Sequence, residues 1–141
     1  MGVAEGLFGT LADEVGYPYN HYNTQMFHSF SGGYASEASL CGALGVAATF
    51  VGAVLEPAEA RPVIKEMMDW YKTADLPIYD SGNRPSGTTT VAKSTLCYDS
   101  VSKYIKADNL EYADGERKER CASVTADVSR YIVEVLNEKL G

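Results

Sequence analysis

The sequence predicts an all-α fold, a single-domain bundle of about five helices with one buried central helix. Two observations support this class. Apolar residues recur at helical spacing in several segments, and no segment shows the sustained two-residue alternation that is typical of strands. In addition, 141 residues of which 45% are hydrophobic are enough for one domain with a substantial core.

The first helix is expected over residues 3–15, where apolar side chains return every three or four positions. Gly16 and Pro18 end it, because neither residue continues a helix well. The next segments are expected to be an extended aromatic connector, a short helix and a turn, at residues 17–22, 24–30 and 31–34.

The central helix is expected over residues 36–55. Residues 38–55 carry no charge and are about as long as a bilayer crossing requires, so a membrane span is the alternative. A helix buried within the protein is favoured, because these residues are mostly small and no basic clusters flank them. The other helices are amphipathic and can cover it. No membrane insertion is therefore expected.

The C-terminal half contains three more expected helices and one long irregular segment. Pro57 opens the first of these helices, and Pro62 lies near its first turn, where proline is either tolerated or forces a second start. Residues 75–94 are expected to be irregular and either functional or mobile. The last two helices are expected at residues 94–107, capped by Ser94, and 114–140, capped by Asp114.

The formal net charge is −7, from 19 acidic and 12 basic residues. This balance argues against nucleic acid and against an anionic membrane surface as partners, although it is compatible with a basic protein partner. The N-terminus lacks the basic start and long apolar stretch of a signal peptide. The chain as it stands is therefore expected in the cytoplasm, and an upstream signal sequence would change this to the periplasm.

The three cysteines, Cys41, Cys97 and Cys121, are the strongest chemical feature. An odd number cannot pair completely within the chain, so a disulfide framework is not indicated. Thiols converging from three helices can bind a soft metal or an iron–sulfur cluster. A single free cysteine is more often a small buried hydrophobe, and there is no CxxC or CxxCH spacing. The residues alone leave both interpretations open.

Each cysteine has a distinct expected setting. Cys97 falls in the first turn of its helix, where the exposed amide groups favour a thiolate. Cys121 shares an apolar stripe with Val124 and Val128. Cys41 is followed by small residues that leave room beside its sulfur for a neighbouring helix or an inorganic group.

Other candidates are weaker. His21 and His28 are each a possible fourth metal ligand or a haem ligand for a partner, but a histidine packed or hydrogen-bonded at the surface is the simpler interpretation. Trp70 is expected to serve packing rather than electron relay. The charged run at residues 116–120 is expected to be a solvated helix face.

Four segments of the sequence resemble a known redox-active family named for its C…GCAxxG…C…C pattern. They are SGGYASEASLCGALGVAATFVG, DWYKTADLPIY, STLCYDSVSKYIKA and ERCASVTADVSRYIVEVLN, and they cover nearly the whole chain in order. Within this family they are most similar to the iron–sulfur domain of split-Soret cytochromes c. The resemblance implies a helical domain that dimerises and holds an iron–sulfur cluster through its thiols, which by position are Cys41, Cys97 and Cys121.

The sequence departs from the family pattern in three ways. The motif around Cys41 reads LCGALG rather than GCAxxG, and haem attachment motifs are absent. The family's first cysteine, expected just before Gly2 and Val3, is also absent. The resemblance therefore implies a 2Fe–2S or 4Fe–4S cluster without covalent haem in this chain. Residues 1–141 are expected to form one helical redox domain, or one that lacks an N-terminal extension.

The leading functional hypothesis is an iron–sulfur domain that mediates electron transfer as a homodimer, with a redox partner protein such as a cytochrome. Two alternatives are kept. The first is a cluster-dependent oxidoreductase with one iron position open to substrate. The second is a structural zinc or metal-free interaction module.

Overall fold

The computed structural model describes residues 1–141 as a helical bundle with a very small sheet. The helices are α1 (Gly2–Ala4), α2 (Thr10–Glu14), α3 (Gly42–Val54), α4 (Pro57–Thr73), α5 (Cys97–Asp108) and α6 (Gly115–Leu140). Three shorter turns are η1 (Glu5–Gly9), η2 (Tyr19–His21) and η3 (Thr24–Phe30). The two strands are β1 (Asp75–Leu76) and β2 (Thr90–Val91). The predicted all-α class is confirmed.

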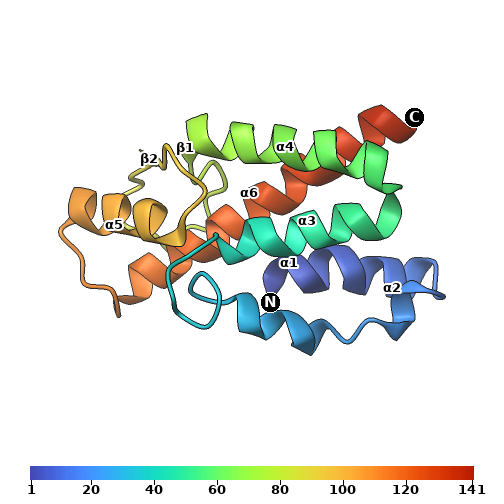
Figure 1. The fold of residues 1–141 in the computed structure, drawn as a ribbon. Coiled ribbons are helices and arrows are strands. Elements are labelled where there is room, and N and C mark those ends of the chain that lie inside the picture. Colours follow the sequence, from blue (N-terminus) through green and yellow to red (C-terminus); the bar gives the residue numbers. More distant parts are fainter.

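Helix α3 lies at the centre of the bundle, as the sequence predicted (Figure 1). It contacts α4, α6, α1, η1 and η3, so neighbouring elements surround it. Its small residues allow these neighbours to approach closely, and Leu44, Ala47 and Val51 are completely buried. None of the helices combines the length and the apolar character that a membrane crossing requires.

The first helix is continuous from Gly2 to Glu14 but contains a π turn at Glu5–Gly9. Phe8 on this turn joins three segments of the core. Its ring stacks on Phe27 of η3 at 4.9 Å between centroids and meets Phe50 of α3 edge-on at 5.2 Å. Aromatic contacts of this kind add to the burial energy and fix the first helix against α3.

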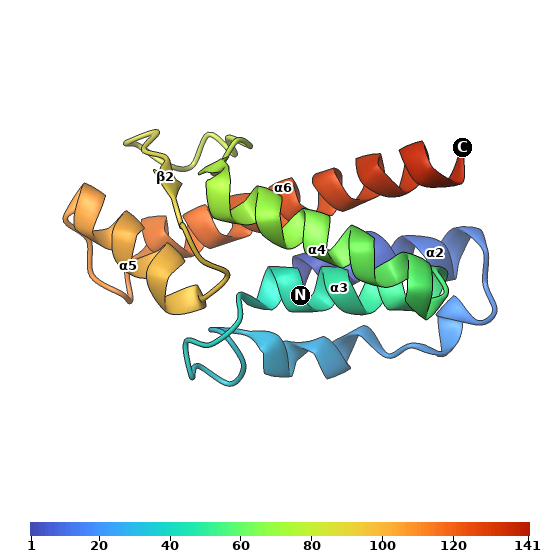
Figure 2. The ribbon, with the colours of Figure 1, turned by 45° about the horizontal axis from the view of Figure 1, so that its top comes forward.

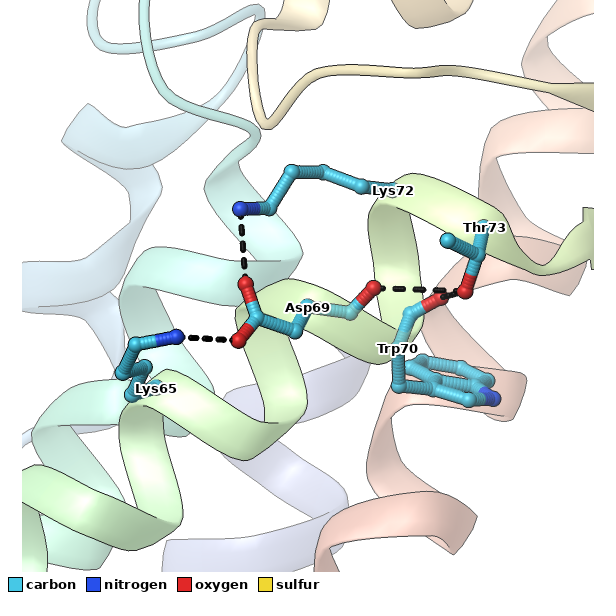
Figure 3. A network of polar contacts seen from close by, with 5 residues as sticks. All are labelled: Lys65, Asp69, Trp70, Lys72 and Thr73. Atoms are coloured by element: carbon cyan, nitrogen blue, oxygen red, sulfur yellow. Dashed lines mark hydrogen bonds and ion pairs between the residues drawn. The ribbon is translucent and has the colours of Figure 1, made fainter.

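Helix α4 runs without interruption through Pro62, so this proline is tolerated. On the exposed face of α4, Asp69 pairs with Lys65 and with Lys72 at 2.7 Å (Figure 3). Hydrogen bonds from these two lysines lower the pKa of Asp69 to about 2.

Trp70 stacks on Tyr131 of α6, with ring centroids 4.1 Å apart. The expected packing role of Trp70 is therefore confirmed, and its side chain belongs to the interface between α4 and α6.

The segment at residues 75–94 is attached to the rest of the protein by specific contacts. β1 and β2 pair in antiparallel fashion, and both strands are too short to produce a visible sequence alternation. The buried carboxylate of Asp127 in α6 accepts hydrogen bonds from the backbone N–H groups of Ile78 at 2.7 Å and Tyr79 at 2.9 Å. These bonds attach the segment to α6 beside α5 (Figure 2).

Candidate functional site

Cys41 and Cys97 lie side by side because the segments before α3 and α5 pair with each other. Leu40 and Leu96 form an isolated antiparallel bridge. The Cys41 N–H donates to the Thr95 carbonyl at 2.9 Å, and the Cys97 N–H donates to the Ser39 carbonyl at 2.6 Å. Cys41 is the N-cap of α3, and Cys97 is the first residue of α5. Two helix N-termini therefore present cysteines at the same place.

The predicted boundaries of these two helices are corrected by the structure. Residues 36–40 are not helical, since α3 begins only at Gly42, and α5 begins at Cys97 with Leu96 rather than Ser94 at its N-cap. The loop before α3 contains an unusual run of left-handed backbone conformations, with positive φ at Gly32, Gly33, Tyr34, Ala35, Ser36 and Ala38. Such conformations cost energy outside glycine. Backbone bonds within the loop, such as that from the Ala38 N–H to the Gly32 carbonyl at 2.9 Å, hold them in place, and the pairing with residues 95–98 fixes the end of the loop from Ala38 onwards.

Cys121 reaches the same region from the second turn of α6. The three cysteines, although far apart in sequence, line one cavity of about 360 Å³. The convergence predicted from the sequence is confirmed at this level. No group of three histidine, cysteine, aspartate or glutamate side chains has an arrangement that fits a single metal ion.

The rest of the cavity wall comes from several elements. Met1, Gly2 and Val3 contribute from the start of the chain, and other residues come from the turn at residues 30–33 and from α3, α4, α5 and α6. The position at which the family pattern expects its first cysteine thus lies at the cavity. Neither His21 nor His28 lines it, and both are exposed. No residue of the 75–94 segment lines it either.

All three thiols are half-buried. Burial raises the pKa of Cys97 to about 11, helped by the neighbouring Cys41 and Cys121, and the positive charges of Arg117 and Arg120 oppose this only in part. The expectation that the helix start favours a thiolate at Cys97 is therefore wrong for the metal-free protein, because desolvation outweighs it. A bound cation would reverse the balance by stabilising the thiolates.

A buried chain of polar groups continues from the cysteines into the protein. The hydroxyl of Tyr71 donates to Ser100 Oγ at 2.9 Å, and Arg120 Nη1 donates to the same oxygen at 2.9 Å. Burial and the neighbouring Cys41 raise the pKa of Tyr71. Tyr71 is therefore a neutral phenol, and its one hydroxyl proton goes to Ser100.

The prediction that residues 116–120 form a solvated face is wrong at Arg120, which is buried. Its side chain is buried, with 2% of its surface exposed, and Nε and Nη2 have no hydrogen-bond partner. A signal was present in the sequence, because Arg120 stands four and eight residues before Val124 and Val128 and so shares their buried stripe. Ser100 and Tyr71 were also not identified as site residues from the sequence.

A helical bundle that gathers three thiols around one cavity defines a thiol-based site for redox or metal chemistry. The sequence matches the family described as "Putative redox-active protein (C_GCAxxG_C_C)" over residues 2–135. The chain belongs to this family of redox-active proteins.

Two comparisons, one with a curated sequence and one with a solved structure, support this assignment. Split-Soret cytochrome c from Desulfovibrio desulfuricans is 32% identical over 99% of this chain and 52% of its own length. A solved structure described as a novel iron centre in the split-Soret cytochrome c from the same organism superposes with a TM-score of 0.92. It is 29% identical, over 98% of this chain and 60% of that chain. The chain thus spans somewhat more than half the length of these relatives.

These findings overturn the cofactor prediction. An iron–sulfur cluster of the 2Fe–2S or 4Fe–4S type, without covalent haem, is not what the relatives point to, because they are a cytochrome c whose iron centre is described as novel. The prediction depended on the resemblance of the cysteine-containing segments to the family and on the lack of haem attachment motifs in this chain. Neither observation describes an unfamiliar iron centre, nor the part of the relatives that lies outside the matched region.

Proposed function

We propose that this protein holds a redox-active iron centre through the thiolates of Cys41, Cys97 and Cys121 and uses it to transfer electrons. The observation that carries the proposal is the convergence of these cysteines, from the starts of α3 and α5 and from α6, on one cavity. When bound, such a centre supplies a site that accepts and returns electrons. Membership of a redox-active family supports the same conclusion.

The residues around the cavity fit a group of this kind. Thiolates are soft anionic ligands suited to iron, and 14 of the 23 lining residues are hydrophobic, which limits access of water. The cavity volume of about 360 Å³ exceeds what one ion requires. The pairing of residues 38–41 with 95–98 holds two of the sulfurs at fixed positions, so the ligand set is pre-arranged.

The neighbouring polar groups have roles that follow from their contacts. Tyr71 lines the cavity together with Cys41, and its hydroxyl donates to Ser100 at 2.9 Å. Ser100 fixes Tyr71 and Arg120 relative to each other, because it accepts from both.

A second candidate function is catalysis at an open iron position. The observation that favours it is that Cys41, Cys97 and Cys121 are the only cysteine or histidine residues in the cavity wall. A centre with three protein ligands has room for water or a substrate, which is how metal sites acquire reactivity. Turnover with candidate electron acceptors, measured against simple reduction of the centre, would separate catalysis from relay.

The test is to purify the protein without oxygen and to measure iron, zinc and acid-labile sulfide together with the visible spectrum. We expect iron in the protein and reversible bleaching of thiolate-to-iron absorption on reduction. Replacing each of the three cysteines by serine should lower the iron content. Ser123→Ala is the matched control, since Ser123 is buried on α6 near Cys121 but outside the cavity, and its hydroxyl has no partner. A colourless protein that contains zinc would overturn the proposal in favour of a structural metal site.

A further inference from the structure

Arg120 is a buried cation that has no counter-charge in the protein. Its side chain is 2% exposed and lines the cavity of the three cysteines. Only Nη1 has a hydrogen-bond partner, the neutral oxygen of Ser100, whereas Nε and Nη2 are buried and unpartnered. None of the four ion pairs of the structure includes Arg120.

The other neighbours of Arg120 do not neutralise it. The ring of Tyr104 lies 5.4 Å from its guanidinium carbon, which is a weak cation–π contact. Asp127, the buried carboxylate on the same helix, accepts from the backbone of Ile78 and Tyr79 instead. An arginine cannot lose its proton in a protein, and an uncompensated buried charge is strongly unfavourable. Arg120 lines the cavity of the three cysteines, so the cavity is the place from which an anion can approach it.

We infer that Arg120 is the counter-charge and hydrogen-bond donor of the anionic group that the three cysteine thiolates complete in the cavity, an inference that rests on the proposed function. The free Nε and Nη2 atoms form one edge of the guanidinium, the arrangement that binds anions with two parallel hydrogen bonds. Thiolates bound to iron, together with a further inorganic or exogenous anion, give the group the negative charge that this edge requires.

The position of Arg120 is fixed for this role. Ser100 on α5 holds Nη1, and Ser100 is itself held by Tyr71 on α4, so three helices set the orientation of the guanidinium. Because the charge is close to the centre and shielded from water, it favours the state that carries one more electron. Arg120 is therefore a positioning residue that raises the reduction potential and strengthens iron retention.

The first experiment compares iron affinity and reduction potential in the parent, Arg120→Met and Arg120→Lys. Arg120→Met should lower the potential and weaken iron binding by about 10- to 100-fold, the usual effect of losing an outer partner of a metal site. Arg120→Lys keeps the charge and should keep most of the potential. The matched control is Arg130→Met, which should leave the potential and the iron affinity unchanged. Arg130 lies on the same helix, but it is exposed and does not line the cavity.

The second experiment measures melting temperature with and without iron. Removing an unpaired buried charge should make metal-free Arg120→Met melt higher than the metal-free parent, whereas the iron-loaded variant should melt lower than the iron-loaded parent. A purely structural arginine would lower both values.

The two proposals fail in different ways. If Arg120→Met keeps the parent's potential and iron affinity while the cysteine variants lose iron, the inference is overturned and the proposed function stands. If the cysteine variants keep their iron, the proposed function fails. If Arg120→Met does not fold, Arg120→Gln, which also removes the charge, takes its place: a potential below the parent's supports the inference, and a potential equal to the parent's overturns it.

Discussion

The backbone of Gly33 lies directly against the side chain of Cys97, so that a Cβ on Gly33 would be only 2.7 Å from the Cys97 Cβ. Gly33 also has a φ of +73°, a conformation that residues with a side chain adopt at a cost. The turn at residues 31–34 thus forms the wall of the cavity behind one of the candidate ligands. No other residue type fits at this position without moving the cysteine.

Replacing Gly33 by alanine is expected to disturb the site through this contact. The positive φ alone costs roughly 1–2 kcal/mol, and the overlap with the Cys97 side chain and with the backbone of Ala38 and Ser39 adds to it. We expect a lower melting temperature and a lower iron content. Gly82→Ala is the control, because Gly82 has a φ of +76° but nothing lies within 4 Å of its missing Cβ. Equal iron loss in the two variants would show that the contact with Cys97 is unimportant.

The metal-free protein should show an unusually basic thiol at Cys97. Because burial and the neighbouring cysteines raise its pKa to about 11, the thiol is neutral at pH 7, and its alkylation should accelerate with pH without a plateau below pH 10. Mass spectrometry of iodoacetamide-treated protein gives the rate at each pH. Replacing Cys41 and Cys121 by serine removes two of the raising influences, so the profile should shift to lower pH. A plateau near pH 8–9 in the parent would contradict this prediction.

A fourth thiol can be introduced at Val3, which is buried and lines the cavity. Valine and cysteine are close in volume, so Val3→Cys should cost the metal-free protein less than about 1.5 kcal/mol. The added ligand should slow the loss of iron in air, followed by the decay of visible absorption. Val51→Cys is the control, because Val51 is buried in α3 outside the cavity. Equal decay in parent and Val3→Cys would show that residue 3 does not reach the centre.

We expect a two-fold homodimer that uses the exposed aromatic surface around η2 and η3. Tyr17 is 74% exposed, and Val15, Tyr22 and Met26 are exposed as well. Large apolar side chains gathered in one part of the surface are typical of interfaces. Light scattering should report a dimer at micromolar concentration, and the double variant Tyr17→Glu, Met26→Glu should report a monomer. Ile78→Glu, also at an exposed apolar residue, should remain dimeric, and a monomeric parent would rule out the prediction.

Much of the fold could be predicted because local signals and tertiary structure agree there. Pro57 marks the first residue of α4, and Asp114 stands at the N-cap of α6, as expected from helix-capping preferences. The start of α3 could not be placed, because the residues before it pair with residues 95–98 and take left-handed conformations without being glycines. That pairing is a long-range contact, and no local preference encodes it.

The candidate site was predictable only in part. The three cysteines could be selected because the family pattern adds information that their spacing lacks. The shape of the centre could not be deduced, since the same three thiols serve several kinds of iron site. The burial of Arg120 was not predicted, because four charged residues precede it in the sequence and such runs are usually solvated. Its position on the Val124 stripe was the one sign of burial.

The placement of the two chain ends relative to the cavity decides how this protein should be handled in the laboratory. Met1 and Gly2 line the cavity, so an affinity tag fused before them would sit at its wall and compete with whatever binds there. Helix α6 carries the chain from Cys121 to Leu140, a distance of about 28 Å at the rise of an α-helix, and ends at the far side of the bundle (Figure 1). Tags, fluorophores and surface tethers for electrochemistry therefore belong after Gly141.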